Sequence, residues 1–191
     1  MRDDSRRSMV RAAAMLFQER GYAATSFQDV IARSGAPRGS IYHHFPGGKQ
    51  ELAIEALRWY SDRTAALMRQ KTQEGTAIEA VAGFLAISRE ALRKSDFRAG
   101  CPVAGVALDL ADNDEALQAA VAEAFEEWRR VLAAAFERDG ATPAKARRLA
   151  AFVYASLEGA LMLARAHRDL RPMDDVITEL LDHLERVSGS K

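Results

Sequence analysis

The feature that most restricts the fold of this chain is the helical spacing of its apolar residues. Val10, Ala13 and Phe17 recur at intervals of three and four, and the same spacing returns from Leu117 to Phe136 and from Val176 to Val187. Such intervals place side chains on one face of an α-helix, whereas strict alternation would indicate a strand. No stretch alternates convincingly. We therefore expect an all-α protein of about nine helices, far from the usual mixture of helix and sheet.

Glycine and capping residues mark the ends of the first helices. Gly21 and Gly35 each follow a short apolar stripe, where a left-handed residue commonly ends a helix. Ser26 or Thr25 can cap the helix between them. A further short helix is expected over Arg38–His44. Later boundaries are expected at Gly75, Ser95–Pro102, Asp114, Gly140, Thr142-Pro143 and Pro172.

Charge is divided unevenly along the chain. The 27 basic residues balance the 27 acidic ones, so the formal net charge is zero. Residues 1–50 nevertheless hold eight Arg or Lys against four Asp or Glu, whereas residues 51–191 hold nineteen against twenty-three. The whole-chain charge therefore gives no support for a nucleic-acid partner, but the basic N-terminal segment is compatible with one.

Composition disfavours secreted and membrane-spanning proteins. The single cysteine, Cys101, cannot form an intrachain disulfide framework and is expected to be a small buried residue rather than a redox sensor. No apolar signal-peptide core follows the charged N-terminus. The most apolar stretch, Leu149–Ala164, contains Glu158 and is shorter than the roughly 20 residues of a membrane span. We expect a cytoplasmic protein without a membrane partner.

Residues 25–52 contain the motif that indicates a function. Two short helices are joined by Ser34-Gly35-Ala36, the arrangement of a helix-turn-helix, whose second helix enters the major groove of DNA. Val30, Ile31 and Ile41 are the inward positions that set the angle between the helices. The other positions of the second helix carry groups suited to base edges or phosphate oxygens, namely Arg38, Gly39, Ser40, Tyr42, His43 and His44.

Gly39 and Lys49 fit contact with a DNA backbone. Gly39 has no side chain, so the main chain can approach its partner closely. Lys49 stands at the start of the following helix, where its ammonium group and the N-terminal amides of that helix can bind one phosphate.

The string from Thr25 to Pro46, TSFQDVIARSGAPRGSIYHHFP, resembles the DNA-binding signature of the tetracycline-repressor (TetR) family, and Lys49 and Leu52 match its trailing positions. Gly100–Ala104 also resembles the LmrA/YxaF-like subgroup. Residues 36–38, Ala-Pro-Arg, stand where many relatives carry Val-Ser-Lys, so the base preference could differ.

The resemblance implies a homodimeric repressor with a helix-turn-helix domain over residues 1–48 and a ligand-binding and dimerisation domain over residues 49–191. The dimer would form through the last two helices, bind a palindromic operator, and be released by a small apolar or aromatic effector. The resemblance implies phosphate contacts for Thr25, Ser26, Tyr42 and Lys49, and positions nearest to bases for Arg38, Gly39 and His43. It implies a partly structural role for His44 and Phe45.

Candidate ligand-lining residues are large apolar side chains of the second domain: Phe84, Ile87, Leu108, Phe125, Trp128, Phe152 and Met162. For any single one of them core packing is favoured, and the sequence does not separate the two roles, but as a group they are expected to contain the pocket. Glu158 and Arg165 interrupt apolar helical stretches. They could anchor a polar ligand group, pair across the dimer interface or reach solvent.

Catalytic and metal sites are not indicated. No Ser/His/Asp set, paired carboxylates or glycine-rich phosphate loop is present, so we expect no enzyme activity and no cofactor. His43 and His44 are adjacent, and neighbouring residues on a helix point about 100° apart, which does not suit one metal ion. The alternative function is that of a helical interaction protein that does not bind DNA.

Overall fold

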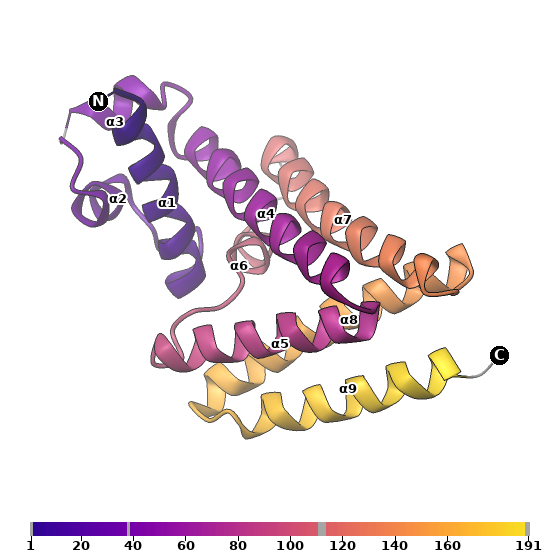
Figure 1. The fold of residues 1–191 in the computed structure, drawn as a ribbon. Helices are drawn as coiled ribbons and strands as arrows, with labels where there is room; N and C mark the ends of the chain where they lie inside the picture. Colours follow the sequence, from indigo (N-terminus) through magenta and orange to yellow (C-terminus); the bar gives the residue numbers. More distant parts are fainter. Residues whose placement is uncertain (1, 38, 111–113, 190–191) are drawn as a thin grey trace. The chain divides into compact units, whose positions relative to one another are not determined.

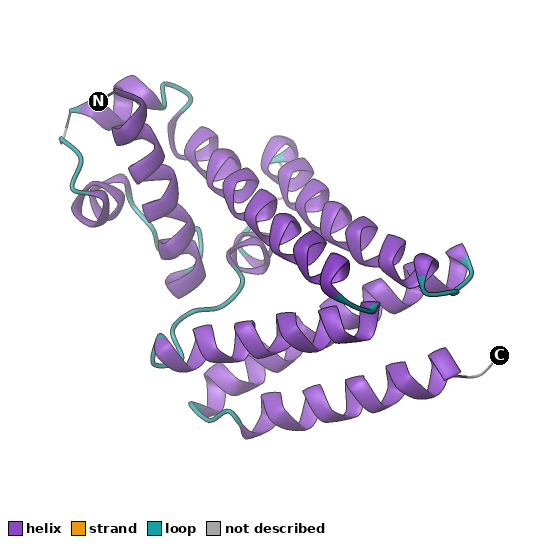
Figure 2. Cartoon of the chain, viewed as in Figure 1, coloured by secondary structure: helices purple, strands orange, loops and turns teal. Residues whose placement is uncertain are grey.

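A computed structural model of the chain describes residues 2–37, 39–110 and 114–189. Over these ranges it contains nine α-helices and no strand, which confirms the predicted fold class (Figures 1 and 2). The helices are α1 (Arg2–Arg20), α2 (Phe27–Ser34), α3 (Ser40–His44), α4 (Gly48–Glu74), α5 (Ala77–Lys94), α6 (Pro102–Leu108), α7 (Glu115–Arg138), α8 (Pro143–His167) and α9 (Arg171–Gly189).

Short-range chemistry sets most of the helix ends. Gly21 and Gly35 have φ angles of 83° and 69°, a left-handed conformation that favours glycine, and both lie where helix ends were expected. Ser26 caps α2, and Thr142 caps α8 ahead of Pro143. The helix α1 begins at Arg2, before its apolar stripe, and α3 begins at Ser40, two residues after its expected start. Arg38, the expected first residue of that helix, lies outside the described residues.

The chain divides into two compact units. Unit 1 comprises residues 1–62 and 101–125, and unit 2 comprises residues 63–100 and 126–191. The helices α4 and α7 therefore each contribute to both units. This division is by compactness, whereas the predicted boundary between residues 48 and 49 is by function, and that boundary stays a prediction.

Unit 1 is built around α1, which packs against α2, α3 and α6. Met9, Ala13 and Phe17 of α1 are fully or almost fully buried. The contact with α6 is close because Gly105 faces α1: a Cβ atom on Gly105 would lie 3.0 Å from the carbonyl oxygen of Phe17. At the other end of α6, the backbone N–H of Ala23 donates to Asp109 Oδ2 at 2.9 Å. Thus α6 is joined to the segment between α1 and α2.

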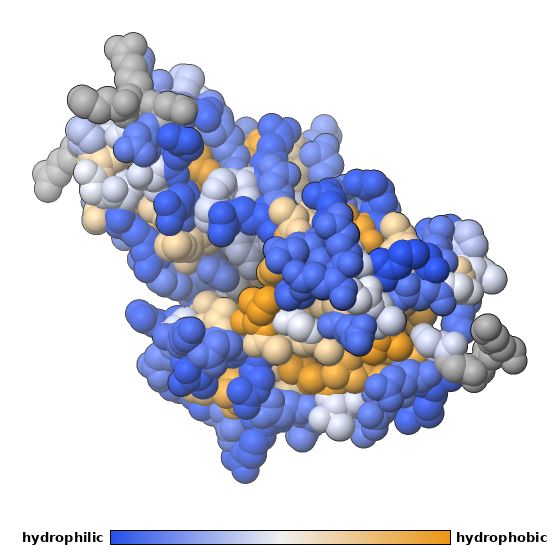
Figure 3. All heavy atoms as spheres, in the orientation of Figure 1, coloured by the Kyte–Doolittle hydropathy of each residue, from blue (hydrophilic) through white to orange (hydrophobic). Residues whose placement is uncertain are grey.

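Unit 2 has α8 as its central helix. Leu149, Val153, Leu157 and Leu161 of α8 are buried, and α8 packs along α9. By length and composition alone α8 could cross a membrane, which the sequence analysis did not expect, but 44% of its most apolar window is buried inside the protein. Figure 3 shows apolar surface in a band in the region of α5 and α9, bordered by hydrophilic side chains.

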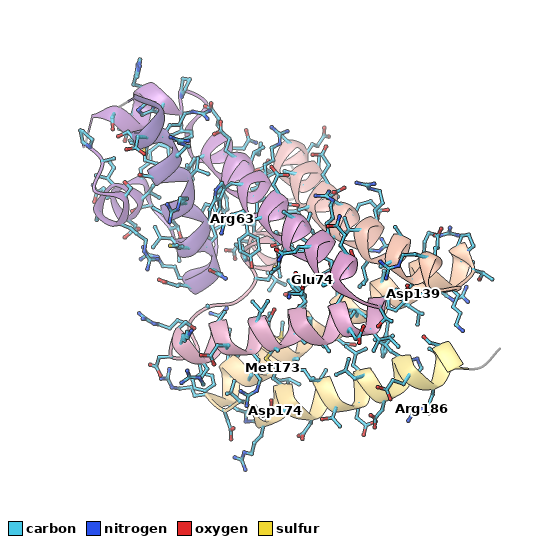
Figure 4. All side chains as sticks on the ribbon, in the orientation of Figure 1. Arg63, Glu74, Asp139, Met173, Asp174 and Arg186 are labelled. Carbon is cyan, nitrogen blue, oxygen red and sulfur yellow. The ribbon has the colours of Figure 1, made fainter. Side chains whose placement is uncertain are left out.

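Ion pairs and caps join the helices of unit 2. Met173 and Asp174 lie at the start of α9 (Figure 4); Met173 is fully buried, and Asp174 forms a two-point ion pair with Arg89 of α5 at 2.5 and 2.9 Å. The Arg89 guanidinium lowers the pKa of the Asp174 carboxyl. At the end of α7, Asp139 accepts a hydrogen bond from the first amide of α5, at Ala77 (2.5 Å). Arg138 donates to the carbonyl oxygen of Gly75 (2.8 Å), just beyond the end of α4.

Candidate nucleic-acid interface and ligand-domain residues

The helix-turn-helix of α2 and α3 has a buried inner face. Of the three expected inward positions, Val30 is 1% exposed and Ile41 is fully buried, whereas Ile31 is only part-buried. Phe45, at the end of α3, is also fully buried and is therefore part of the core. The Gly35 N–H donates to the carbonyl oxygen of Ile31 at 3.0 Å and closes α2. The inner face thus leaves the opposite side of α3 free to contact a partner.

The outer face of α3 presents polar side chains to solvent. Tyr42 is 69% exposed, and its ring packs edge-to-face on Phe27 of α2 with a centroid separation of 5.4 Å. Gly39 and His43 are exposed, whereas Ser40 and His44 are part-exposed. The Ser40 hydroxyl donates to the Pro37 carbonyl oxygen at 2.7 Å. These described candidates for DNA contact therefore lie together on α3 and at its N-cap.

The two predicted phosphate contacts that precede α2 have structural partners. Thr25 is only 2% exposed, and its hydroxyl donates to the Gly21 carbonyl oxygen at 2.8 Å, so in this conformation it is closed to DNA. Ser26 is exposed but forms a capping box with Asp29: the Ser26 N–H donates to Asp29 Oδ2 (2.8 Å) and the Asp29 N–H donates to Ser26 Oγ (3.2 Å). The bonds from Ser26 lower the pKa of the Asp29 carboxyl.

Lys49 is held against the protein. Its Nζ lies 4.2 Å from the Tyr22 ring centroid and donates to the Ala23 carbonyl oxygen at 3.3 Å. Burial lowers the pKa of the Lys49 ammonium, and the carboxylates of Asp109 and Asp29 oppose that shift. Lys49 therefore stabilises the segment between α1 and α2, and contact with a phosphate would compete with these partners.

Several basic residues of unit 1 form ion pairs inside the unit. Arg20 pairs with Asp29 at 3.0 Å, and Arg33 pairs with Glu19 at 2.7 Å. Arg6 pairs with Glu55, and its guanidinium carbon lies 5.2 Å from the Phe45 ring centroid. The pairs of Arg20 and Arg33 lie within residues 1–50 and are already cancelled in the excess of four, so of these three pairs only that of Arg6 with Glu55 reduces the excess that the segment can offer to DNA.

The predicted ligand-lining residues do not form one group. Phe84 of α5 and Trp128 of α7 are buried, and both rings approach Tyr154 of α8, at centroid separations of 6.3 and 5.8 Å. Tyr154 was missed in the sequence analysis, although an aromatic residue among the small residues of α8 was a signal for it. Leu108, 76% exposed, and Phe125, part-exposed, belong to unit 1.

The remaining three ligand candidates lie on helix surfaces. Ile87, Phe152 and Met162 are 42%, 45% and 59% exposed. The Phe152 ring contacts His183 of α9 at a centroid distance of 5.3 Å. Both side chains line a groove of about 410 Å³ between α8 and α9, together with Val176, Glu179, Leu180 and Arg186.

The possible metal ligands and the single cysteine have the following surroundings. Over the described residues, no group of three or more His, Cys, Asp or Glu side chains is placed to hold a metal ion. The rings of His43 and His44 lie 5.5 Å apart. Cys101 is only part-buried; it caps α6, with its sulfur accepting a hydrogen bond from the Ala104 N–H at 3.5 Å.

Comparison with known proteins identifies the family. Residues 9–56 match the family described as bacterial regulatory proteins of the tetR family, and residues 77–179 match the LmrA/YxaF-like transcriptional regulator C-terminal domain. An HTH-type transcriptional regulator of Mycobacterium tuberculosis is 40% identical over 92% of this chain and 91% of its own. LmrA of Bacillus subtilis is 32% identical over 96% and 98%.

A solved structure has the same fold. The TetR-family regulator CifR, a cysteine-substituted variant in complex with a 26-base-pair operator duplex, aligns with a TM-score of 0.78 and 24% identity. The alignment covers 92% of this chain and 94% of CifR. The sequence matches and the all-helical architecture agree over nearly the whole length, so this chain belongs to the TetR family of DNA-binding transcriptional regulators, in its LmrA/YxaF-like group.

Proposed function

We propose that this chain is a ligand-responsive transcriptional repressor, which binds a palindromic operator as a homodimer and is released by a small molecule. The observation that carries the proposal is the exposed polar face of α3, seated on the buried residues Val30, Ile41 and Phe45. Residues 1–48 would form the DNA-binding domain and residues 49–191 the ligand-binding and dimerisation domain. The protein would act in the cytoplasm, without enzyme activity, in keeping with a family of regulators.

The DNA contacts would centre on α3 and on its approach. Two copies of α3 would enter major grooves on one side of the duplex, about 34 Å apart or at a multiple of that distance. Gly39, Tyr42 and His43 would lie against the DNA, together with Arg38. Ser26 and Ser40 would support them by holding the starts of α2 and α3. Thr25 would do so through its bond to Gly21 at the end of α1, and His44 from the last turn of α3. The operator complex of CifR, which shares this fold, supports this arrangement by analogy.

The dimer would form through α8 and α9. The surface of α8 carries three large exposed apolar residues, Phe152, Met162 and Leu163. Ala155 and Gly159 lie between them, and such small residues let two helices approach closely. The groove between α8 and α9 adds a hollow into which a partner's side chains could pack. A two-fold axis would double each of these contacts and form a four-helix interface.

The effector would be apolar or aromatic. Phe84, Trp128 and Tyr154 come from three different helices of unit 2 and bring three aromatic rings together. Flat ring faces and edges suit a planar apolar ligand. Because the coupling between two ligands is reciprocal, operator DNA would weaken effector binding by the same factor by which the effector weakens DNA binding.

The proposed function is tested with a mobility-shift assay on DNA from the region upstream of the chain's own gene. We expect wild-type protein to shift this DNA at low salt, and we expect Arg38→Ala and Tyr42→Phe to bind more weakly. A protein that forms dimers in light scattering but shifts no DNA at low salt, with both variants behaving as wild type, would instead be a helical interaction protein.

Lys49 provides a test of the phosphate contacts. We expect Lys49→Met to lower the slope of log affinity against log salt by about 2 for a dimer, because each lost phosphate contact removes about 0.9 from that slope. The slope is measured by fluorescence anisotropy with labelled operator between low and moderate salt. If the thermal midpoint falls while the salt slope stays as in wild type, the only role of Lys49 is its contact with Tyr22 and Ala23.

A further inference from the structure

Three non-glycine residues with left-handed backbones meet at one corner of unit 2, and no other described non-glycine residue has a positive φ. Asp96 and Phe97 follow the end of α5 with φ angles of 54° and 60°, and Arg168 ends α8 with a φ of 50°. Arg168 Nη2 donates to Asp96 Oδ2 at 2.7 Å, and the Arg168 guanidinium carbon lies 5.9 Å from the Phe97 ring centroid. Aspartate tolerates this backbone region, but it is strained for a bulky phenylalanine.

Local hydrogen bonds shape this turn. The Ser95 hydroxyl donates to the Leu92 carbonyl oxygen at 2.7 Å and accepts from the N–H groups of Arg98 (3.2 Å) and Ala99 (2.8 Å). The Phe97 N–H also donates to the Leu92 carbonyl oxygen, at 3.0 Å. Strained residues persist only where their surroundings enforce the conformation. Here Arg168, which arrives from a different helix, supplies the long-range part of that enforcement.

The turn directly precedes the point where the chain passes from unit 2 to unit 1. The chain crosses between the two units three times, and at residues 62–63 and 125–126 it does so from unit 1 to unit 2 within the uninterrupted helices α4 and α7. At Gly100–Cys101 the passage is non-helical. Hinges are usually a few residues at the ends of elements, which absorb a change in backbone angles. This passage can therefore change its backbone without breaking a helix.

The far side of the passage leads to the DNA-binding helices. Cys101 caps α6, and α6 packs closely on α1 at Gly105. Asp109, at the end of α6, accepts the hydrogen bond from Ala23 in the segment before α2. Within unit 1, a change in where α6 begins would therefore alter the hydrogen bond between Asp109 and Ala23, in the segment that leads into the helix-turn-helix.

We propose that residues 95–98, held by Arg168, form a strained hinge latch that fixes the start of α6 and so regulates DNA binding. The inference rests on the proposed function, because it names the regulation of that same DNA-binding site. When Arg168 releases Asp96 and Phe97, the strained turn relaxes and α6 loses its fixed start. The segment of residues 21–26 then becomes less ordered, and DNA binding must order it again, so the operator affinity falls.

The first test is hydrogen–deuterium exchange on the free protein with Arg168→Asn. Asparagine tolerates the left-handed backbone but lacks the guanidinium group. We expect faster exchange at residues 96–99, throughout α6 and at the Ala23 amide. The control is Arg171→Gln, which removes the ion pair of Arg171 with Asp169 at the same corner and does not touch the latch. Faster exchange confined to residues 95–99 and 168–171 would overturn the proposal.

The second test measures operator affinity. We expect Arg168→Asn to weaken binding at least fivefold relative to Arg171→Gln, the lower end of usual coupling factors. Asp96→Asn, which keeps a residue tolerant of this backbone, should give the same pattern more weakly and serves if Arg168→Asn does not fold. Absence of any shift by the wild type would refute the proposed function and leave the exchange test standing. Wild-type binding with unchanged affinity in both variants would refute the latch alone.

Discussion

Replacement of Gly39 by alanine is expected to weaken operator binding by about 100-fold while leaving the folding stability unchanged. Gly39 has φ and ψ angles of −81° and −12°, which alanine adopts freely, and an added Cβ atom would meet nothing within 4 Å. The free protein is therefore indifferent to the extra methyl group. In the complex, the methyl group would push against DNA that lies on this backbone. A loss of about 1.4 kcal/mol of binding free energy at each of two half-sites gives the 100-fold weakening.

To test this prediction, the operator affinity and the thermal midpoint of unfolding are measured on the same samples of the wild type and of Gly39→Ala. Fluorescence anisotropy with a labelled operator duplex at fixed salt gives the affinity, and differential scanning calorimetry gives the midpoint. Gly83→Ala in α5 is the matched control, because its Cβ would meet only the flexible Lys71 side chain, at 3.3 Å. If Gly39→Ala binds as tightly as this control, the backbone at Gly39 does not lie against DNA.

Helix ends are the part of this fold that could be read from the sequence. Gly21 and Gly35 were expected to end helices and have left-handed backbones, and Thr142 was expected to open α8 and caps it. Each of these signals acts between residues within about four positions of one another. They are therefore visible in the order of residues alone, without knowledge of how the helices pack.

Long-range partners could not be read in this way. The basic residues at positions 1–50 were expected to face DNA, but Arg20 and Arg33 are held by carboxylates of the same segment, and Arg6 pairs with Glu55 outside it. Lys49 lies over Tyr22. A count of charges contains no information on which of them meet in the fold. For the same reason the sequence did not indicate that Asp109 would hold the Ala23 amide, 86 residues away.

Apolar helix positions were ambiguous for a related reason. Phe84 and Phe152 both lie on apolar stripes, yet Phe84 is 8% exposed and packs on Tyr154, whereas Phe152 is 45% exposed on α8. A stripe shows that a helix face avoids water. It does not show whether the core, a ligand or a second subunit covers that face. Exposure in the isolated chain separates only the residues that the core covers from those that it does not, and Phe152 on α8 belongs to the second group.

Met162→Glu is expected to convert the dimer to a monomer and to weaken operator binding by roughly 1000-fold or more. Met162 is 59% exposed on α8. Phe152 and Leu163 of the same helix are also exposed, although all three side chains are large and apolar. In a two-fold interface the substitution occurs twice, and each carboxylate would be buried without a partner. A monomer holds only one half-site and loses the gain from simultaneous binding of both.

The oligomeric state is measured by sedimentation equilibrium over a range of protein concentrations, and the operator affinity on the same preparations. Gln118→Glu places the same charge at an exposed position of α7 and should leave both the dimer and its affinity for DNA intact. A cooperative thermal transition in Met162→Glu is required, so that loss of the dimer is not loss of the fold. A variant that stays dimeric at micromolar concentration would place the interface away from this face of α8, and the groove beside Phe152 and His183 would then be open to solvent.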